Sequence, residues 1–442
     1  MSIRPLHHFT PPSGWMNDPN GVIKFKDKYH IFYQYHPYSL VWGPMHWGHV
    51  VSDDLLHWEH LPIALTPGDE FDKDGCFSGS AIIKDEKLYL IYTGFIYNDD
   101  PEKIIQQQCI AYSEDGIHFT KGGLIIGKNN LPKDFAPNDF RDPSVYLDGD
   151  KYVMLVASRR KNGRGNILKY ESKDLLKWKF VSEVLPIDSS GTMIECPDYV
   201  KDLNLLIYCE QNQPVEGYMH HNLHSNFWRT GEFIFNQFFT RKRGMIDYGF
   251  DFYAPQIIKG DNIMIAWMNM WERNNPSEKY GFAGSMTIPR KLEVVDNELI
   301  QTPVLPKDIE FSRHLNEEYE EYVKVGFYKI EVNNLTSFSL EMRKGEKHAT
   351  SFELINKKWV FSRANSGEEI VGKETDEDSL KGIRKMPYKD INNHVIYIVL
   401  DEFSVELFVD GKSLTSQIYP DEQDDLLKLK VSCLEGTITK YK

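Results

Sequence analysis

Hydrophobic and polar positions along the chain repeat as short strand patterns with a period near 60 residues. A polar turn followed by a run rich in Tyr and branched residues occurs at residues 28–33, 87–92, 151–156, 203–208 and 262–267. The last residues of these runs lie 59, 64, 52 and 59 positions apart. Such runs are typical of β-strands. Five comparable spacings indicate an internal repeat rather than chance similarity between hairpins.

A second pattern has the same period and predicts further strands. Residues 52–58, 113–119 and 172–178 each begin with Ser, carry Asp at the third position and end with Trp or Phe. They lie 61 and 59 positions apart, and each predicts a turn that leads into another strand. Each unit then holds about four short strands, and four-stranded units in radial repetition form β-propellers. We therefore predict an all-β protein with a five-bladed β-propeller at residues 1–295.

The pattern changes after Pro289. Residues 296–314 contain two prolines and predict a linker. Residues 315–442 alternate between hydrophobic and polar positions, with frequent turns, and predict a β-sandwich. Within this part, the strongly polar stretch 368–381 predicts a loop.

Composition and charge narrow the classes of function. The chain has 51 basic and 65 acidic residues, which gives a net charge of −14. Proteins that bind nucleic acid or an anionic membrane usually carry an excess of basic residues, so these classes are not favoured. No apolar run approaches the ~18 residues that a membrane span needs. Five isolated cysteines and a start without an apolar signal segment favour a cytoplasmic location. The expected partner is a small molecule, and the oligomeric state stays open.

One residue of each unit occupies an equivalent position, 13 to 15 residues before the end of the repeated run. These residues are Asp18, Ser78, Asp142, Glu195 and Tyr253. If the run is the second strand of a blade, they begin the first, innermost strand and converge at one mouth of the propeller. Three carboxylates in one pocket repel one another, so a cluster of this kind indicates a function that needs it. Glycoside hydrolysis needs two carboxylates beside the sugar bond, one protonated and one ionised.

Several motifs resemble those of glycoside hydrolase family 32. They are Trp-Met-Asn-Asp-Pro-Asn-Gly at 15–21, Phe-Tyr-Gln-Tyr-His at 32–36, Trp-Gly-Pro-Met-His-Trp-Gly-His at 42–49, Phe-Ser-Gly-Ser at 77–80, Arg-Asp-Pro at 141–143, Glu-Cys at 195–196 and Asp-Tyr-Gly-Phe-Asp-Phe-Tyr-Ala-Pro at 247–255. The resemblance covers residues 5–295 and, more weakly, the predicted sandwich. Within the family, the chain is most similar to bacterial enzymes that split sucrose and sucrose 6-phosphate.

This resemblance implies an activity. The protein would be a retaining β-fructofuranosidase that hydrolyses the terminal β-D-fructosyl bond of sucrose, sucrose 6-phosphate or short fructo-oligosaccharides by double displacement. Asp18 would be the nucleophile that forms a fructosyl-enzyme, and Glu195 the general acid and then base. Asp142 would hold fructose hydroxyls and stabilise the oxocarbenium-like state. The implied substrate contacts are Asn17, Gln34, Trp42, Phe77, Ser78, Arg141 and Tyr253.

The resemblance implies no cofactor, and the residues do not predict a metal site. His46 and His49 are spaced like a ligand pair, but neither an HExxH motif nor paired cysteines accompany them. In a propeller, such histidines are more often ordinary strand and turn residues.

Other functions fit parts of the pattern. An inverting glycosidase acting on arabinose or xylose polymers would also place its acids on separate blades, and the motif at 15–21 argues against it. A non-catalytic sugar-binding propeller would not need all three acids. A fructosyltransferase would differ from a hydrolase only in the acceptor.

A basic cluster at residues 158–164 stands out in this acidic chain. It follows the second strand of the third unit, and we expect it on the side of the mouth. Arginine offers a bidentate fork to phosphate oxygens, so the cluster could bind a phosphate on the glucose of the substrate. A solvated turn is the alternative.

Overall fold

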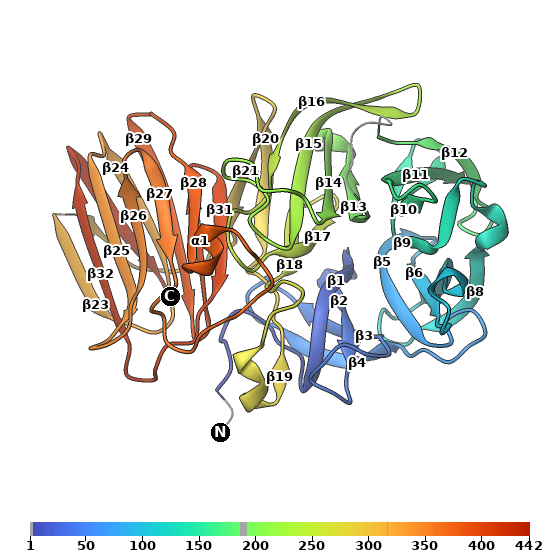
Figure 1. The fold of residues 1–442 in the computed structure, drawn as a ribbon, viewed down its shortest axis with the longest axis horizontal. Helices are drawn as coiled ribbons and strands as arrows, with labels where there is room; N and C mark the ends of the chain where they lie inside the picture. Colours follow the sequence, from blue (N-terminus) through green and yellow to red (C-terminus); the bar gives the residue numbers. More distant parts are fainter. Residues whose placement is uncertain (1–2, 186–191, 316) are drawn as a thin grey trace.

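The strands of this protein form seven sheets (Figure 1). The computed structural model describes residues 3–185, 192–315 and 317–442. Among these residues the single α-helix is the short α1 (Glu377–Leu380), accompanied by four 3-10 turns. The prediction of an all-β protein is therefore confirmed. In the same part of the chain, no helix is long and apolar enough to cross a membrane.

Five of the sheets are the blades of a β-propeller, as predicted. Their strands are, blade by blade, β1 (Gly14–Phe25), β2 (Lys28–His36), β3 (His46–Ser52) and β4 (Glu59–Leu65); β5 (Gly75–Lys84), β6 (Lys87–Ile96), β7 (Ile105–Ser113) and β8 (Thr120–Ile126); β9 (Phe135–Asp148), β10 (Lys151–Arg160), β11 (Gly165–Ser172) and β12 (Lys179–Glu183); β13 (Ile194–Val200), β14 (Leu205–Gln211), β15 (His224–Ile234) and β16 (Gln237–Met245); β17 (Tyr253–Ile258), β18 (Ile263–Trp267), β20 (Arg290–Val295) and β21 (Glu298–Pro303). The short β19 (Phe282–Ala283) pairs with β1.

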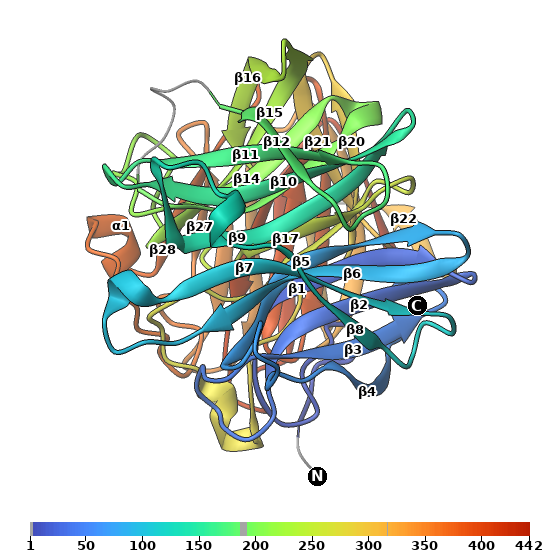
Figure 2. The same ribbon diagram turned by 90° about the vertical axis from the view of Figure 1, so that its right-hand side faces the viewer.

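The first strands of the five blades form a closed ring at the centre of the propeller. Strand β1 contacts β5, β5 contacts β9, β9 contacts β13, β13 contacts β17, and β17 contacts β1. Figure 2 shows β1, β5, β9 and β17 gathered in the middle of the view. The second strands carry the repeated runs on which the prediction rested, apart from one or two leading residues in the last two blades. The start of each innermost strand therefore faces one mouth.

The Ser-x-Asp pattern forms the turn between the third and fourth strands. The Ser52 hydroxyl accepts from the Leu55 N–H at 2.8 Å, and Asp54 accepts from the next two N–H groups at 2.9 Å. Equivalent hydrogen bonds recur in the other two copies. The residue after Asp is left-handed in all three, with φ 70° at Leu55 and Leu175 and 83° at Gly116. Side-chain oxygens thus offset a backbone conformation that leucine disfavours.

The remaining two sheets pack face to face as a sandwich, drawn in orange and red in Figure 1. One contains β22 (Ile309–His314), β33 (Glu435–Tyr441), β24 (Gly326–Asn333), β29 (Asn393–Asp401), β30 (Ser404–Val409) and β31 (Lys412–Gln417). The other contains β23 (Glu318–Tyr322), β32 (Leu426–Ser432), β25 (Ser337–Lys344), β26 (Thr350–Ile355), β27 (Lys358–Ser362) and β28 (Ile383–Pro387). Buried residues alternate along β24 and β32, as expected for strands with one face in a core.

The linker predicted at residues 296–314 is largely strand. Strand β21 completes the fifth blade, and β22 is the first strand of the sandwich, so only residues 304–308 connect the two. The prediction took the two prolines as the sign of an extended linker, but neither lies in one. Pro303 ends β21, an outermost strand on which proline is tolerated, and Pro306 lies in the short connection.

Buried charges join the two domains. The Arg290 side chain, fully buried, donates to Asp247 at 3.0 Å and pairs with Glu406 of the sandwich. His8 lies 2.8 Å from Asp401 and 2.9 Å from Glu406. Burial opposes the imidazolium charge, but these two carboxylates raise the pKa of His8 to about 9. Buried charges are costly unless they are paired, so these contacts favour one arrangement of the domains.

Candidate active site

Each first strand carries a β-bulge at the predicted site position. The pairing of first and second strands shifts register near Asp18, Ser78, Asp142, Glu195 and Tyr253. Bulges re-aim side chains and often occur beside active sites. Three bulged residues have positive φ, and Pro follows each of them: Asp142 (59°), Cys196 (51°) and Ala254 (49°). Proline fits there because the bulge interrupts the ladder of hydrogen bonds.

Asp18 is held by two hydrogen-bond donors. The Ser78 hydroxyl donates to Asp18 Oδ2 at 2.7 Å, and the Asn17 amide donates to Asp18 Oδ1 at 3.0 Å. Trp15 Nε1 in turn donates to Asn17 Oδ1 at 2.9 Å, which fixes the orientation of that amide. The side chain of Asp18 is therefore oriented on both oxygens.

Asp142 lies beside Asp18, with Cys196 between them. Cys196 Sγ is 3.6 Å from Asp18 Oδ2 and 3.6 Å from Asp142 Oδ2. The backbone N–H of Cys196 donates to Asp142 Oδ2 at 3.0 Å. The N–H of Asp142 donates to the Thr93 hydroxyl at 3.1 Å. Residues of four blades thus meet at these two carboxylates.

Both oxygens of Glu195 accept hydrogen bonds. Arg141 Nη2 donates to Glu195 Oε1 at 2.9 Å, and the Tyr253 hydroxyl donates to Glu195 Oε2. Arg141 is itself oriented by Asp139, which accepts from Nη1 at 2.8 Å. The structure therefore brings the three predicted acids together with Ser78, Asn17, Arg141 and Tyr253.

Burial is the main influence on the two aspartates. It raises the pKa of Asp18, against the hydrogen bonds from Asn17 and Ser78. It raises the pKa of Asp142 to about 7, against the positive charge of Arg141 and with the help of the other two carboxylates. Carboxylates this close titrate as a set, so the group retains a proton near neutral pH.

Glu195 differs from the two aspartates. Although burial works in the opposite direction, Arg141, His224 and Tyr253 hold the pKa of Glu195 below its usual value. A general acid needs a proton at working pH. In this structure both donors to Glu195 therefore favour its ionised form.

Aromatic side chains line one side of the site. Trp42, 44% exposed, lies on the loop between β2 and β3, with its ring 5.8 Å from that of Phe77. Phe77 stacks on Phe95 at 4.3 Å. Gln34 is buried, and its amide donates to the Cys76 carbonyl at 3.0 Å, which ties β2 to β5. Of the predicted substrate contacts, Trp42 is thus the exposed one and Gln34 is held by the scaffold.

The basic cluster divides between two directions. Arg159 Nε donates at 2.6 Å to Asp139, the residue that also orients Arg141. Arg159 is therefore on the side of the site. It lies within β10, which extends to Arg160, and not in the loop after that strand as predicted. Arg160 instead pairs with Glu183 of the outer strand β12.

Three residues at the site escaped the sequence analysis: Thr93, Phe95 and Asp139. Thr93 and Phe95 lie on β6 just beyond the repeated run, and Asp139 precedes the Arg-Asp-Pro motif. Extending each run by a few residues would have flagged the first two, because the second strand passes beside the bulge. The role of Asp139 as a bridge between two arginines required the tertiary structure.

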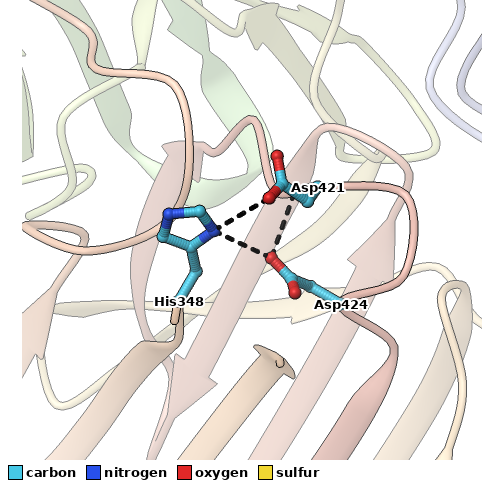
Figure 3. A group of neighbouring side chains, drawn as sticks. All are labelled: His348, Asp421 and Asp424. Atoms are coloured by element: carbon cyan, nitrogen blue, oxygen red, sulfur yellow. Dashed lines mark hydrogen bonds and ion pairs between the residues drawn. The ribbon is translucent and has the colours of Figure 1, made fainter. Parts of the chain in front are cut away.

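One group of potential metal ligands occurs among the described residues, and it lies in the sandwich. It consists of His348, Asp421 and Asp424 (Figure 3). His348 Nδ1 is 3.1 Å from Asp424 Oδ2 and 3.4 Å from Asp421 Oδ2, so the three side chains contact one another directly. It belongs to a different domain from the three acids of the propeller.

Comparisons with known proteins agree with this site. The family model "Glycosyl hydrolases family 32 N-terminal domain" matches residues 8–303, and "Glycosyl hydrolases family 32 C terminal" matches residues 302–440. A sucrose-6-phosphate hydrolase of Zymomonas mobilis is 38% identical over 98% of this chain and 90% of its own.

Solved structures share the whole fold. The sucrose-6-phosphate hydrolase of Lactobacillus gasseri matches with a TM-score of 0.89 and 26% identity, over 99% of this chain and 93% of its own. A mutant of a Bombyx mori β-fructofuranosidase in complex with sucrose matches with a TM-score of 0.82 and 31% identity, over the same shares.

A propeller with three converging carboxylates, in the company of these relatives, defines a glycoside hydrolase. The chain belongs to glycoside hydrolase family 32, and its reaction is the hydrolysis of a fructosyl bond. Neither an inverting hydrolase of arabinose or xylose polymers nor a non-catalytic propeller is favoured by these findings.

Proposed function

We propose that this protein is a retaining β-fructofuranosidase acting on sucrose and sucrose 6-phosphate. The observation that carries the proposal is the meeting of Asp18 and Glu195, each with both oxygens oriented by donors, at one mouth of the propeller. In double displacement, one carboxylate attacks the anomeric carbon while the other protonates the leaving oxygen.

In the first step, Asp18 attacks C2 of fructose and forms a fructosyl ester. Ser78 and Asn17 each donate to one oxygen of this carboxylate, which fixes its direction. The bond from C2 to the glucosyl oxygen breaks, and Glu195 gives that oxygen a proton. In the second step, Glu195 removes a proton from water, which displaces Asp18 and releases fructose with its original configuration.

Arg141 orients Glu195 and affects its charge. Its guanidinium donates to Glu195 Oε1 and lowers the pKa of Glu195, so a substrate that draws Arg141 away would favour the protonated, acidic form. Glu195 gives up its proton in the first step and recovers one from water in the second, so the proton balance closes on Glu195 itself. Asp142 lies beside Asp18, where its ionised carboxylate can accept hydrogen bonds from fructose hydroxyls and stabilise positive charge on the ring.

The stereochemistry of the product tests this function. We expect purified protein to split sucrose into glucose and fructose, with β-fructose as the first anomer in early NMR spectra, because two inversions at C2 restore the configuration. An α-fructose first product would exclude double displacement. Absence of hydrolysis of both sucrose and sucrose 6-phosphate would exclude the function.

Recognition of phosphate is the finer part of the proposal. Arg159 is one-third exposed and lies next to Asp139 and Arg141 on the side of the site. A phosphate on the glucose of the substrate could bind to the guanidinium of Arg159. Charge-assisted hydrogen bonds to phosphate are among the stronger polar contacts in proteins.

Replacing Arg159 should therefore separate the two substrates. We expect Arg159→Gln to raise KM for sucrose 6-phosphate about tenfold or more and to change KM for sucrose less than threefold, because a hydrogen bond to a charged group contributes ~1.5–3 kcal/mol. Arg160→Gln is the matched control, since Arg160 pairs with Glu183 instead. If Arg159→Gln raised KM equally for both substrates, Arg159 would not bind the phosphate and would only hold Asp139 in place.

A further inference from the structure

A segment of the sandwich reaches across to the propeller. We call residues 366–381, between β27 and β28, the strap. The strap contains α1, which lies near the boundary of the two domains in Figure 1. Most of it was predicted as a loop, and outside α1 it has no regular structure. It contacts two propeller loops, residues 212–223 between β14 and β15 and residues 268–281 between β18 and β19.

Both propeller loops leave their second strand at the end where the catalytic residues lie. Tyr253 pairs with Trp267, the last residue of β18. Glu195 pairs with Cys209, near the end of β14. Contacts of the strap with these loops are therefore made on the side of the catalytic pocket.

The loop after β18 is held by Arg273 and Asn274. Arg273, 1% exposed, pairs with Glu374 of the strap and donates to Asp251 at 2.8 Å. Asn274 exchanges hydrogen bonds with Val371 of the strap, at 2.7 Å through its side chain and 3.2 Å through its N–H. A buried guanidinium needs paired carboxylates, so Glu374 determines where this loop can lie.

The loop after β14 is held by His221 and Asn222. His221 Nδ1 lies 2.9 Å from Asp376 Oδ1 of the strap, and the Ser379 hydroxyl donates to the His221 carbonyl at 3.1 Å. Asn222 Oδ1 accepts from Arg273 at 3.3 Å, which connects the two loops to each other. The strap and both loops thus form one hydrogen-bonded unit.

Each loop passes this constraint to a catalytic carboxylate. Trp271 of the loop after β18 stacks on Trp15, with centroids 6.1 Å apart, and Trp15 orients the Asn17 amide that donates to Asp18. The loop after β14 leads directly into His224, the first residue of β15, whose ring lies 5.6 Å from that of Tyr253. The Tyr253 hydroxyl donates to Glu195.

We infer that the strap is a positioning element of the active site, in which Glu374 and Asp376 of the sandwich hold the two loops that orient Asp18 and Glu195. The inference rests on the proposed function, because its main effect is measured as fructoside hydrolysis. It gives the sandwich an indirect part in catalysis, through the position of the two loops. Neither residue is proposed to touch the substrate.

The test compares Glu374→Gln and Asp376→Asn with Glu377→Gln. Glu377 also lies in the strap but pairs with Lys381, the residue that follows α1, so it is the matched control. The assay is made well below the unfolding temperature of each variant. We expect kcat for sucrose to fall about tenfold to 100-fold in Glu374→Gln and Asp376→Asn, with a smaller change in KM. Misplacement of catalytic groups by about 1 Å has effects of this size. The control should keep the kcat of the wild type.

Tryptophan fluorescence supplies an independent measure, because Trp15 and Trp271 report the position of the loop after β18. We expect the emission spectrum to change in Glu374→Gln and to stay unchanged in the control Glu377→Gln.

Unchanged kcat in folded Glu374→Gln and Asp376→Asn, or an equal loss in Glu377→Gln, would overturn the inference. If Glu374→Gln does not fold, Asp376→Asn and Asn274→Ala decide it by the same measurements. A wild-type protein that cleaves no fructoside would refute the proposed function, and the fluorescence comparison would still test the strap.

Discussion

Asp18→Asn should abolish nearly all hydrolysis of sucrose, by a factor of roughly 10³ or more in kcat, while the protein remains folded. The amide keeps the shape of the carboxylate and can still accept from Ser78, but it cannot form the fructosyl ester. The measurement is the initial rate of glucose release, with the unfolding temperature as a control for the fold. A loss of less than tenfold would reject Asp18 as the nucleophile.

Asp18→Ala allows a sharper test with azide. Without the nucleophile, azide can enter the space of the carboxylate and attack C2 directly, so a single inversion would yield an α-configured fructosyl azide. This experiment should use a fructoside with an activated leaving group, which needs little protonation. A β-configured product from Asp18→Ala would contradict the assigned role.

Glu195→Gln should lower kcat for sucrose by about 10²–10⁴-fold, the usual contribution of general acid catalysis. Hydrolysis of an activated aryl fructoside should suffer less in its first step, and a burst of released phenol should appear because the second step still lacks its base. Equal losses on sucrose and on the activated substrate would contradict the assignment. In Glu195→Ala, azide would attack the fructosyl-enzyme and give the β-configured azide.

The pH dependence follows from the need for a protonated acid. The protonated form of Glu195 is the active one, so the wild-type rate on sucrose should fall as pH rises through the pKa of Glu195. In Glu195→Gln this alkaline decline should disappear for the activated substrate, because no proton must be donated. Its persistence would show that another group causes it.

Local patterns were sufficient to predict most of the fold. The runs at 28–33 and 87–92 became β2 and β6 because alternation over five or six residues is a local property of a strand. The repeat spacing then indicated the number of blades. The linker at 296–314 was wrong because a proline on an outermost strand and a proline in a connection look the same in sequence.

The sequence by itself determined the three acids of the site, since the equivalent positions of Asp18, Asp142 and Glu195 follow from the repeat. Only the tertiary structure decided their electrostatic state and their supports. Arg141 and Tyr253 approach Glu195 from different blades, and Glu374 reaches the loop after β18 from another domain. Hydrogen bonds and charge interactions act over a few ångströms in space, between residues as far apart in the chain as His8 and Glu406, which are separated by 398 positions, so no local pattern records them.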